Sequence, residues 1–135
     1  MSLITWDPSY SVKVSRCDED HKKLFALINS LHEAMSSGKG AAVVQQVVDE
    51  LADYTQYHFS AEEALLEKTQ YPALKSHRAQ HQEFVKRVKQ FQQDLTVAKS
   101  GQSVFVLNFL KDWLSGHIKQ TDQKYSAHLN ANGVS

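Results

Sequence analysis

The sequence has little of what commonly breaks or staples a chain: its 135 residues include one cysteine, two prolines and five glycines. A single cysteine cannot form an internal disulfide, so we expect a fold without covalent staples and a reducing compartment. Sparse proline and glycine disfavour a turn-rich β fold and favour long helices. A chain of this length can bury a hydrophobic core as one domain.

The sequence also lacks a net charge and a long apolar run. Lysine plus arginine and aspartate plus glutamate balance at 15 each, which gives no electrostatic reason to expect nucleic acid or an anionic membrane as a partner. No apolar run approaches the roughly 20 residues that span a bilayer. The first residues show no basic segment followed by an apolar one, so we expect no secretion signal and a cytoplasmic protein without membrane insertion.

Apolar residues recur every three or four positions through most of the chain, which predicts amphipathic helices. We expect a single domain over residues 1–135 with three parts, which are a non-helical arm over 1–17, a helical bundle over 18–129 and a tail over 130–135. The arm carries Trp6 and Tyr10, whose rings should pack across one end of the bundle.

Four helices are predicted within the bundle. The first has Asp18 as its N-cap and ends at Ser36-Ser37-Gly38. The others run over residues 41–68, from Pro72 to about Gly101, and from Ser103 to about Leu129. Because the connections are short, neighbouring helices should be antiparallel. The predicted fold class is therefore all-α, an up-down-up-down four-helix bundle.

Side chains of the metal-ligand type interrupt the apolar faces of all four helices. They are His21 on the first, His58 and Glu62 on the second, His77 and His81 on the third, and His117 and Asp122 on the fourth. A lone histidine on an apolar face is usually a satisfied core residue. Burying this many polar groups without a shared partner would cost roughly several kcal/mol apiece. The directions of the helices place all of them at a similar height, so a metal centre inside the bundle is the simplest explanation.

Periodicity leaves one ligand open and excludes two other histidines. Asp122 follows His117 by five residues, a step that turns it by about 140° on a regular helix, although its own row of side chains also faces inward. His32 and His128 share a face with proposed ligands but lie roughly 16 Å further along the axis, at opposite ends of the bundle. We interpret both as structural or solvent-facing.

Imidazoles and carboxylates in this ratio suit iron, zinc or manganese, and the set is too large for one tetrahedral zinc. Two six-coordinate metals that share both carboxylates and one solvent-derived oxygen as bridges would keep about one position open for a small molecule. The side chains expected to line that position are apolar and offer no general acid or base: Leu24, Phe59, Trp113, Leu114 and Ile118. Such a pocket favours binding a small apolar molecule over transforming it.

With these residues in view, the sequence resembles the bacterial hemerythrins (bacteriohemerythrins) of the hemerythrin family. The matching segments are DEDHKKLF around His21, YHFSAEEALL around His58 and Glu62, SHRAQH around His77 and His81, and WLSGHIKQTDQKY around His117 and Asp122. The N-terminal arm with its two aromatic residues also matches. The resemblance covers essentially the whole chain, and every ligand of the family has its counterpart here.

The resemblance implies reversible dioxygen binding at a non-haem di-iron centre, for oxygen carriage or storage, by a protein that is not an enzyme. The implied ligands of the two irons (Fe2+/Fe3+) are His77, His81 and His117 for one and His21 and His58 for the other, with Glu62, Asp122 and an oxo or hydroxo group as bridges. Dioxygen would bind at the two-histidine iron. Two positions depart from the family pattern: Cys17 stands where an aliphatic residue is common, and Leu66 where methionine is common.

Several alternatives stay open at this point. The chain could sense oxygen, or it could be a di-iron enzyme that acts on nitric oxide or peroxide, with minor oxidase activity included. A bundle whose histidines bind structural zinc or nothing is the plainest alternative. Beyond dioxygen itself, an oxygen-accepting protein that the sequence does not identify is a candidate partner.

Overall fold

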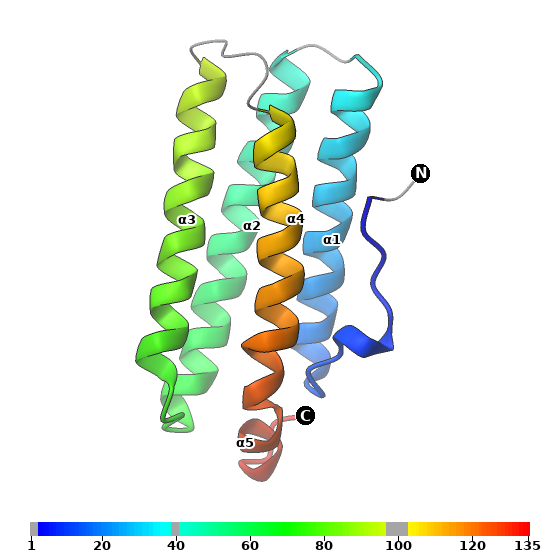
Figure 1. The fold of residues 1–135 in the computed structure, drawn as a ribbon. Coiled ribbons are helices and arrows are strands. Elements are labelled where there is room, and N and C mark those ends of the chain that lie inside the picture. The colour runs from blue at the N-terminus through cyan, green and yellow to red at the C-terminus, as the bar shows by residue number, and fades with distance from the viewer. Residues whose placement is uncertain (1–2, 39–40, 97–102) are drawn as a thin grey trace.

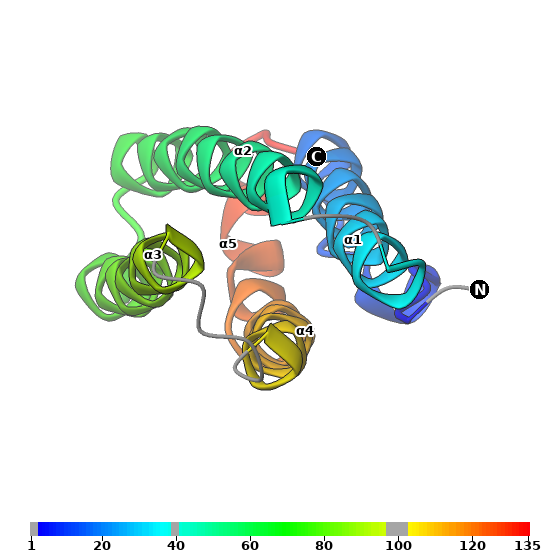
Figure 2. The same cartoon turned by 90° about the horizontal axis from the view of Figure 1, so that it is seen from above.

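The computed structural model describes residues 3–38, 41–96 and 103–135, and the side chains within 3–38, 44–93 and 107–135. Its long helices are α1 (Ser15–Ser36), α2 (Ala41–Lys68), α3 (Leu74–Thr96) and α4 (Ser103–Gln120). They stand side by side with alternating directions (Figure 1) and surround a common interior when seen from above (Figure 2). No strand occurs in these ranges. The predicted all-α up-down-up-down bundle is confirmed.

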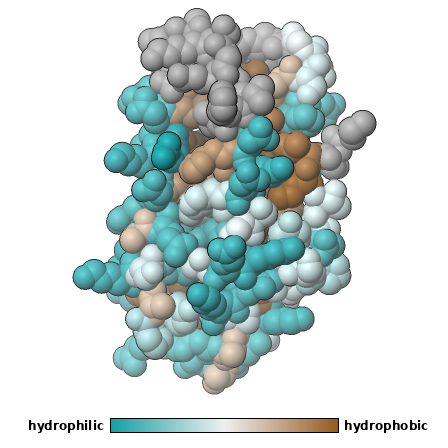
Figure 3. Space-filling view, in the orientation of Figure 1, coloured by the Kyte–Doolittle hydropathy of each residue, from teal (hydrophilic) through white to brown (hydrophobic). Residues whose placement is uncertain are grey.

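The bundle interior is apolar along most of its length. Ile28 and Leu31 of α1 and Val48 and Leu51 of α2 are completely buried and belong to one continuous cluster. Each such side chain stabilises the fold by roughly 1.5–3 kcal/mol through burial. The lower half of the face in Figure 3 is largely hydrophilic, and apolar side chains show mainly above it. In the part of the chain that the structure describes, no helix has the length and apolarity to cross a membrane.

Helix α1 begins at Ser15, so the prediction that Asp18 is its N-cap is wrong. Asp18 lies in the first turn and bonds backwards: its carboxylate accepts hydrogen bonds from the Val12 N–H at 2.8 Å and the Ser11 hydroxyl at 2.7 Å. An acidic side chain in the first turn also interacts favourably with the helix dipole. Asp18 therefore ties the arm to the helix rather than starting the helix.

Helix α3 begins at Leu74 rather than at Pro72. Pro72 and Ala73 form a turn, in which the Leu74 N–H donates to the Tyr71 carbonyl at 3.2 Å. The turn follows Gln70, whose positive φ of 58° reverses the chain after α2. The predicted end of this helix near Gly101 lies outside the described residues.

The fourth helix does not continue to Leu129 as predicted. Helix α4 ends at Gln120 and is followed by a 3-10 turn, η2 (Asp122–Tyr125), and a short helix, α5 (Ser126–Ala131). The Lys124 N–H donates to the Thr121 carbonyl, a tighter spacing than that of an α-helix. This local tightening changes the direction in which Asp122 points, which a regular helix would turn away from His117.

The N-terminal arm lies along the bundle and not only across its end (Figure 1). Asn29 of α1 holds its beginning, accepting hydrogen bonds from the N–H groups of Leu3 and Ile4. Further along, the arm forms a 3-10 turn, η1 (Pro8–Tyr10). The Tyr10 ring packs edge-on against Phe25, 4.9 Å between centroids. The arm thus covers α1 and reaches the end of the bundle where the polar residues gather.

Candidate metal centre

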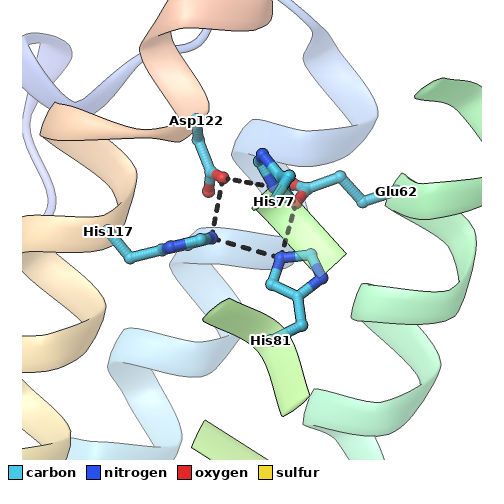
Figure 4. A group of neighbouring side chains, drawn as sticks. All are labelled: Glu62, His77, His81, His117 and Asp122. Atoms are coloured by element: carbon cyan, nitrogen blue, oxygen red, sulfur yellow. Dashed lines mark hydrogen bonds and ion pairs between the residues drawn. The ribbon is translucent and has the colours of Figure 1, made fainter. Parts of the chain in front are cut away.

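All the predicted ligand side chains are buried and come together inside the bundle. His117 is 5% exposed, and each of the others is 1% exposed. Their nitrogen and oxygen atoms form two groups that share a carboxylate, which are Glu62, His77, His81, His117 and Asp122 in one and His21, His58 and Glu62 in the other. Figure 4 shows the larger group, with the side chains pointing toward a common centre.

The histidines present the same ring nitrogen to this centre. His21 Nε2 and His58 Nε2 are 3.1 Å apart, and His81 Nε2 and His117 Nε2 are also 3.1 Å apart. His77 Nε2 lies 2.7 Å from Glu62 Oε1. Nitrogens this close repel unless a proton or a metal ion lies between them, and converging imidazole nitrogens are a common metal site.

The two carboxylates divide their oxygens between the histidine groups. Glu62 Oε1 lies 2.7 Å from His77 Nε2 and 3.1 Å from His81 Nε2, whereas its Oε2 lies 3.2 Å from His58 Nε2. Asp122 repeats the pattern: Oδ1 lies 3.0 Å from His117 Nε2, and Oδ2 lies 3.2 Å from His21 Nε2. Each carboxylate can therefore give one oxygen to each of two metal ions.

Three side chains that the sequence analysis did not identify hold the outer nitrogens of the histidines. Asp20 Oδ2 lies 2.9 Å from His58 Nδ1. Glu63 Oε2 lies 2.8 Å from His81 Nδ1. Gln80 Oε1 lies 2.9 Å from His117 Nδ1. Such partners fix the ring orientation, and carboxylates also raise its basicity as a ligand.

Each outer partner lies beside a ligand of its own helix in the sequence but bonds a histidine of the next helix. Asp20 precedes a ligand of α1 but bonds a histidine of α2, and Glu63 follows a ligand of α2 but bonds a histidine of α3. Gln80 likewise precedes a ligand of α3 and bonds a histidine of α4. Each helix thus braces the ligand of the next helix. The only signal in the sequence is a polar residue beside a ligand.

The pKa values of the two buried carboxylates favour their charged forms in spite of the burial. Burial, the largest influence, raises the pKa of Glu62, but the positive charge of His58 and hydrogen bonds from histidines outweigh it and hold that pKa well below its usual range. The pKa of Asp122 is lowered in the same way, although the neighbouring Glu62 charge opposes the shift. Two adjacent buried anions require nearby positive charge.

The histidines respond in the opposite direction. Burial lowers the pKa of His58, but the charge of Glu62 and the Asp20 hydrogen bond outweigh it and raise the pKa to about 10. The pKa of His77 is raised to about 9, again against burial, by Asp122 and Glu62. These raised pKa values favour protonated imidazoles at His58 and His77. Two divalent cations at the centre would supply the positive charge instead, and their binding must displace these protons.

One buried carboxylate oxygen of this donor set supports a metal ion at the centre. Asp122 Oδ1 accepts no hydrogen bond of good geometry from the described residues, although nitrogens of His77 and His117 lie within 3.1 Å. Its lone pairs face the point on which those nitrogens converge. A cation at that point would satisfy the oxygen and both nitrogens together.

Two of the residues predicted to form a dioxygen pocket contact histidines of the centre, and the other three are buried. Leu24, Leu114 and Ile118 are buried in the core. Phe59 stacks on His81 with 3.7 Å between ring centroids, and Trp113 stacks on His117 with 4.4 Å. The two aromatic rings therefore lie against the group of three histidines. The pocket itself stays a prediction.

The two histidines outside the centre take no part in either ligand group. His128 Nε2 lies 2.9 Å from the Thr69 carbonyl, and its ring packs beside Tyr71. His32 is half-buried on α1. Neither belongs to a group of candidate ligands among the described residues.

Comparison with known proteins places this chain among the hemerythrins. The model of the hemerythrin HHE cation binding domain matches residues 12–129. The chain is 34% identical to a bacteriohemerythrin of Stenotrophomonas maltophilia, over 96% of this chain and 86% of that protein. It is 37% identical to a hemerythrin-like protein of Naegleria gruberi, over 95% of each. A crystal structure of wild-type hemerythrin superposes with a TM-score of 0.89 at 28% identity, covering 95% of this chain and 98% of that one.

Proposed function

Because this chain belongs to the hemerythrin family, we propose that it binds dioxygen reversibly at a non-haem di-iron centre, for oxygen carriage or storage. The observation that carries the proposal is the division of each carboxylate between two histidine groups, with Glu62 and Asp122 each facing both. A single metal ion would not need two carboxylates arranged in this way.

The proposed ligand assignment follows the two groups. His77, His81 and His117 would hold one iron, and His21 and His58 the other. Glu62, Asp122 and an oxo or hydroxo group would bridge them. A pair of ferrous ions supplies two electrons that dioxygen takes up on binding and returns on release. The iron held by fewer histidines would have the open position, and dioxygen is proposed to bind there.

The surroundings of the centre favour binding over chemistry. Leu24, Leu114 and Ile118 are buried and offer neither an acid nor a base. The buried carboxylates of Glu62 and Asp122 are engaged with histidines. Tyr125 donates its hydroxyl proton to Glu62 Oε2 at 2.8 Å, which fixes the orientation of that carboxylate. These residues bind, orient and exclude water, and none is placed to attack an organic substrate.

The test is a visible spectrum recorded on the iron-loaded protein through cycles of anaerobic reduction, air and degassing. The proposal expects two irons per chain and an oxygen-to-iron charge-transfer band that appears with air and disappears on degassing. Irreversible bleaching, or turnover of nitric oxide, would favour an enzyme instead. Two tightly bound zinc ions, or no metal, would overturn the proposal.

A further inference from the structure

The outer hydrogen bond of His58 continues through further side chains to the protein surface. Asp20 bonds His58 Nδ1 with one oxygen and accepts the Tyr54 hydroxyl with the other, at 2.8 Å. The Tyr54 ring lies 5.7 Å from the Tyr57 ring, and Tyr57 is 55% exposed. A buried ligand of the centre is therefore connected to an exposed phenol by two hydrogen bonds and one ring contact.

Among the described residues, the hydrogen bonds behind the other histidines do not lead to a phenol. Glu63, behind His81, pairs with Arg78 at 2.9 Å, and Gln80, behind His117, accepts the Thr121 hydroxyl. None of these side chains gives up an electron readily. The connection from His58 is distinct because it passes through phenols, which can lose an electron and a proton together.

Two other oxidisable side chains lie near the centre but do not offer the same path. Tyr125 donates to Glu62 but is completely buried. Trp113 stacks on His117, a contact between rings that provides no acceptor for the indole proton. Only the Tyr54 hydroxyl combines a carboxylate acceptor with a neighbouring exposed ring, among the residues described.

A shallow surface groove between α1 and α2 contains both phenols. Its lining residues are Lys23, Leu27, Glu50, Asp53, Tyr54 and Tyr57. The ammonium group of Lys23 lies 5.7 Å from the Tyr54 ring, and the Arg16 guanidinium donates to the Tyr57 hydroxyl at 3.4 Å. Flat aromatic molecules pack well against tyrosine rings. The groove is thus a place where a small aromatic electron donor could contact Tyr57.

We propose that Tyr54 and Tyr57 carry single electrons from a small aromatic donor, a phenol or aromatic amine in this groove, to the metal centre when hydrogen peroxide is the oxidant. This activity rests on the proposed di-iron centre and goes beyond oxygen binding. Two donor molecules and one peroxide yield two donor radicals and two waters.

Each transfer balances in electrons and protons. Tyr54 loses an electron through Asp20 and His58 to the centre, and its phenolic proton moves to the Asp20 oxygen that already accepts the hydroxyl. Tyr57 returns an electron to Tyr54, Asp20 returns the proton, and the Tyr57 proton leaves to water. The donor then gives Tyr57 one electron and one proton. Over two such transfers, one hydrogen peroxide takes up two electrons, together with two protons from water that replace those released by Tyr57, and becomes two waters.

The test uses iron-loaded protein whose two irons and reversible oxygen band have first been verified. Peroxide is added without a donor, and the sample is frozen for electron paramagnetic resonance and analysed by peptide mass spectrometry. A second preparation carries ring-deuterated tyrosine. We expect a radical signal that narrows on deuteration and a dityrosine cross-link at Tyr57. Added guaiacol should be oxidised and should suppress both.

Three variants locate the path. Tyr54→Phe should lose both the radical and the cross-link, while Tyr57→Phe should keep the radical and lose the cross-link and most guaiacol oxidation. Tyr71→Phe, a half-buried tyrosine outside the path, should behave as wild type. Because Tyr57→Phe leaves the Asp20 hydrogen bond intact, it tests the path even if Tyr54→Phe loses iron.

Several results would overturn the inference. They are an undiminished radical in an iron-loaded Tyr54→Phe variant, oxidation confined to Trp113 or Tyr125, and the absence of tyrosine oxidation. A protein that binds oxygen reversibly but shows one of these results fails this inference alone. A protein without two irons fails the proposed function as well.

Discussion

Glu62 is the residue that joins the two halves of the centre. Its oxygens face different histidine groups, and Tyr125 and the surrounding imidazoles leave no lone pair directed at solvent. The neighbouring Glu63 has the same side chain but a different task, since it is 20% exposed and bonds the outer nitrogen of His81. The pair therefore allows the carboxylate proposed to bridge the metal ions to be compared with one that bonds the outer nitrogen of a histidine.

Replacing Glu62 by Gln should abolish the paired-iron spectrum, because an amide supplies one oxygen and cannot bridge two metal ions. The matched change Glu63→Gln should keep the spectrum and weaken iron binding by roughly tenfold or more, as expected for an outer partner. Iron content and the visible band measure both effects. An unchanged band in iron-replete Glu62→Gln would show that the bridging assignment is wrong.

Cys17 should be chemically inert in the folded protein. It is 2% exposed, and burial, followed by the negative charge of Glu62, raises the pKa of its thiol to about 12. Since the thiolate is the reactive form, very little of it exists near neutral pH. Alkylation by iodoacetamide should therefore be slow in the native protein and fast after unfolding in denaturant. Rapid alkylation of the native, fully folded chain would contradict this.

The side chains that converge in the candidate centre could be predicted from the sequence and their outer hydrogen-bond partners could not, for a physical reason. His21, His58 and His77 interrupt apolar stripes, so a polar residue in a core position marks them. Asp20 and Gln80 lie one step around the helix, where polar residues normally face solvent. Their role depends on the neighbouring helix, which periodicity within one helix does not report.

At the scale of elements, the break after α4 is what completes the centre. The five-residue step from His117 to Asp122 would separate the two side chains on a regular helix. The 3-10 turn instead places Asp122 Oδ1 3.0 Å from His117 Nε2. Gln80 of α3 holds both sides of this break, because its oxygen accepts the Thr121 hydroxyl and faces His117 Nδ1 at 2.9 Å.

Replacing Gln80 by Leu should therefore loosen the end of α4 and weaken iron binding by roughly 10–100-fold. The matched control is Gln82→Leu, the same change at an exposed position of the same helix. Iron retention during titration with a chelator measures the difference. Equal retention in the two variants would show that the Gln80 contacts do not support the centre.

The helix interiors could be predicted, and three of the ends could not. Asp18 is a good N-cap residue, but its carboxylate is taken by the arm, so α1 begins earlier. Pro72 suits a first helical turn, but the reversal after Gln70 uses it in a turn. The residues before Asp122 favour a continuous helix, but α4 ends at Gln120, next to the converging side chains. At Asp18 and Pro72 hydrogen bonds and turns within a few residues override the preference of the single residue. At Asp122 the contacts between helices do so.

At the scale of the whole molecule, the bundle has an apolar half and a metal-binding half. Leu31 lies on α1 ten residues beyond His21, roughly 15 Å along the axis, and is completely buried. Leu31→Ala should lower the free energy of unfolding by about 2–5 kcal/mol through lost burial and the cavity left behind. The oxygen band should stay unchanged. Thermal unfolding and visible spectra check the two outcomes, and a lost band in the folded variant would show that the halves are coupled.

Removing iron should destabilise the metal-binding half of the bundle. The centre contributes two buried carboxylates and five buried imidazoles, which require a shared partner inside the bundle. A metal that binds only the folded state adds about 2.7 kcal/mol at a concentration one hundred times its Kd. We therefore expect chelation to lower the melting temperature by roughly 10 °C, and anaerobic Fe2+ to restore it. Glu62→Gln, which cannot hold the iron pair, should respond much less to chelator. An equal drop in this variant would mean that the bridged pair does not stabilise the fold.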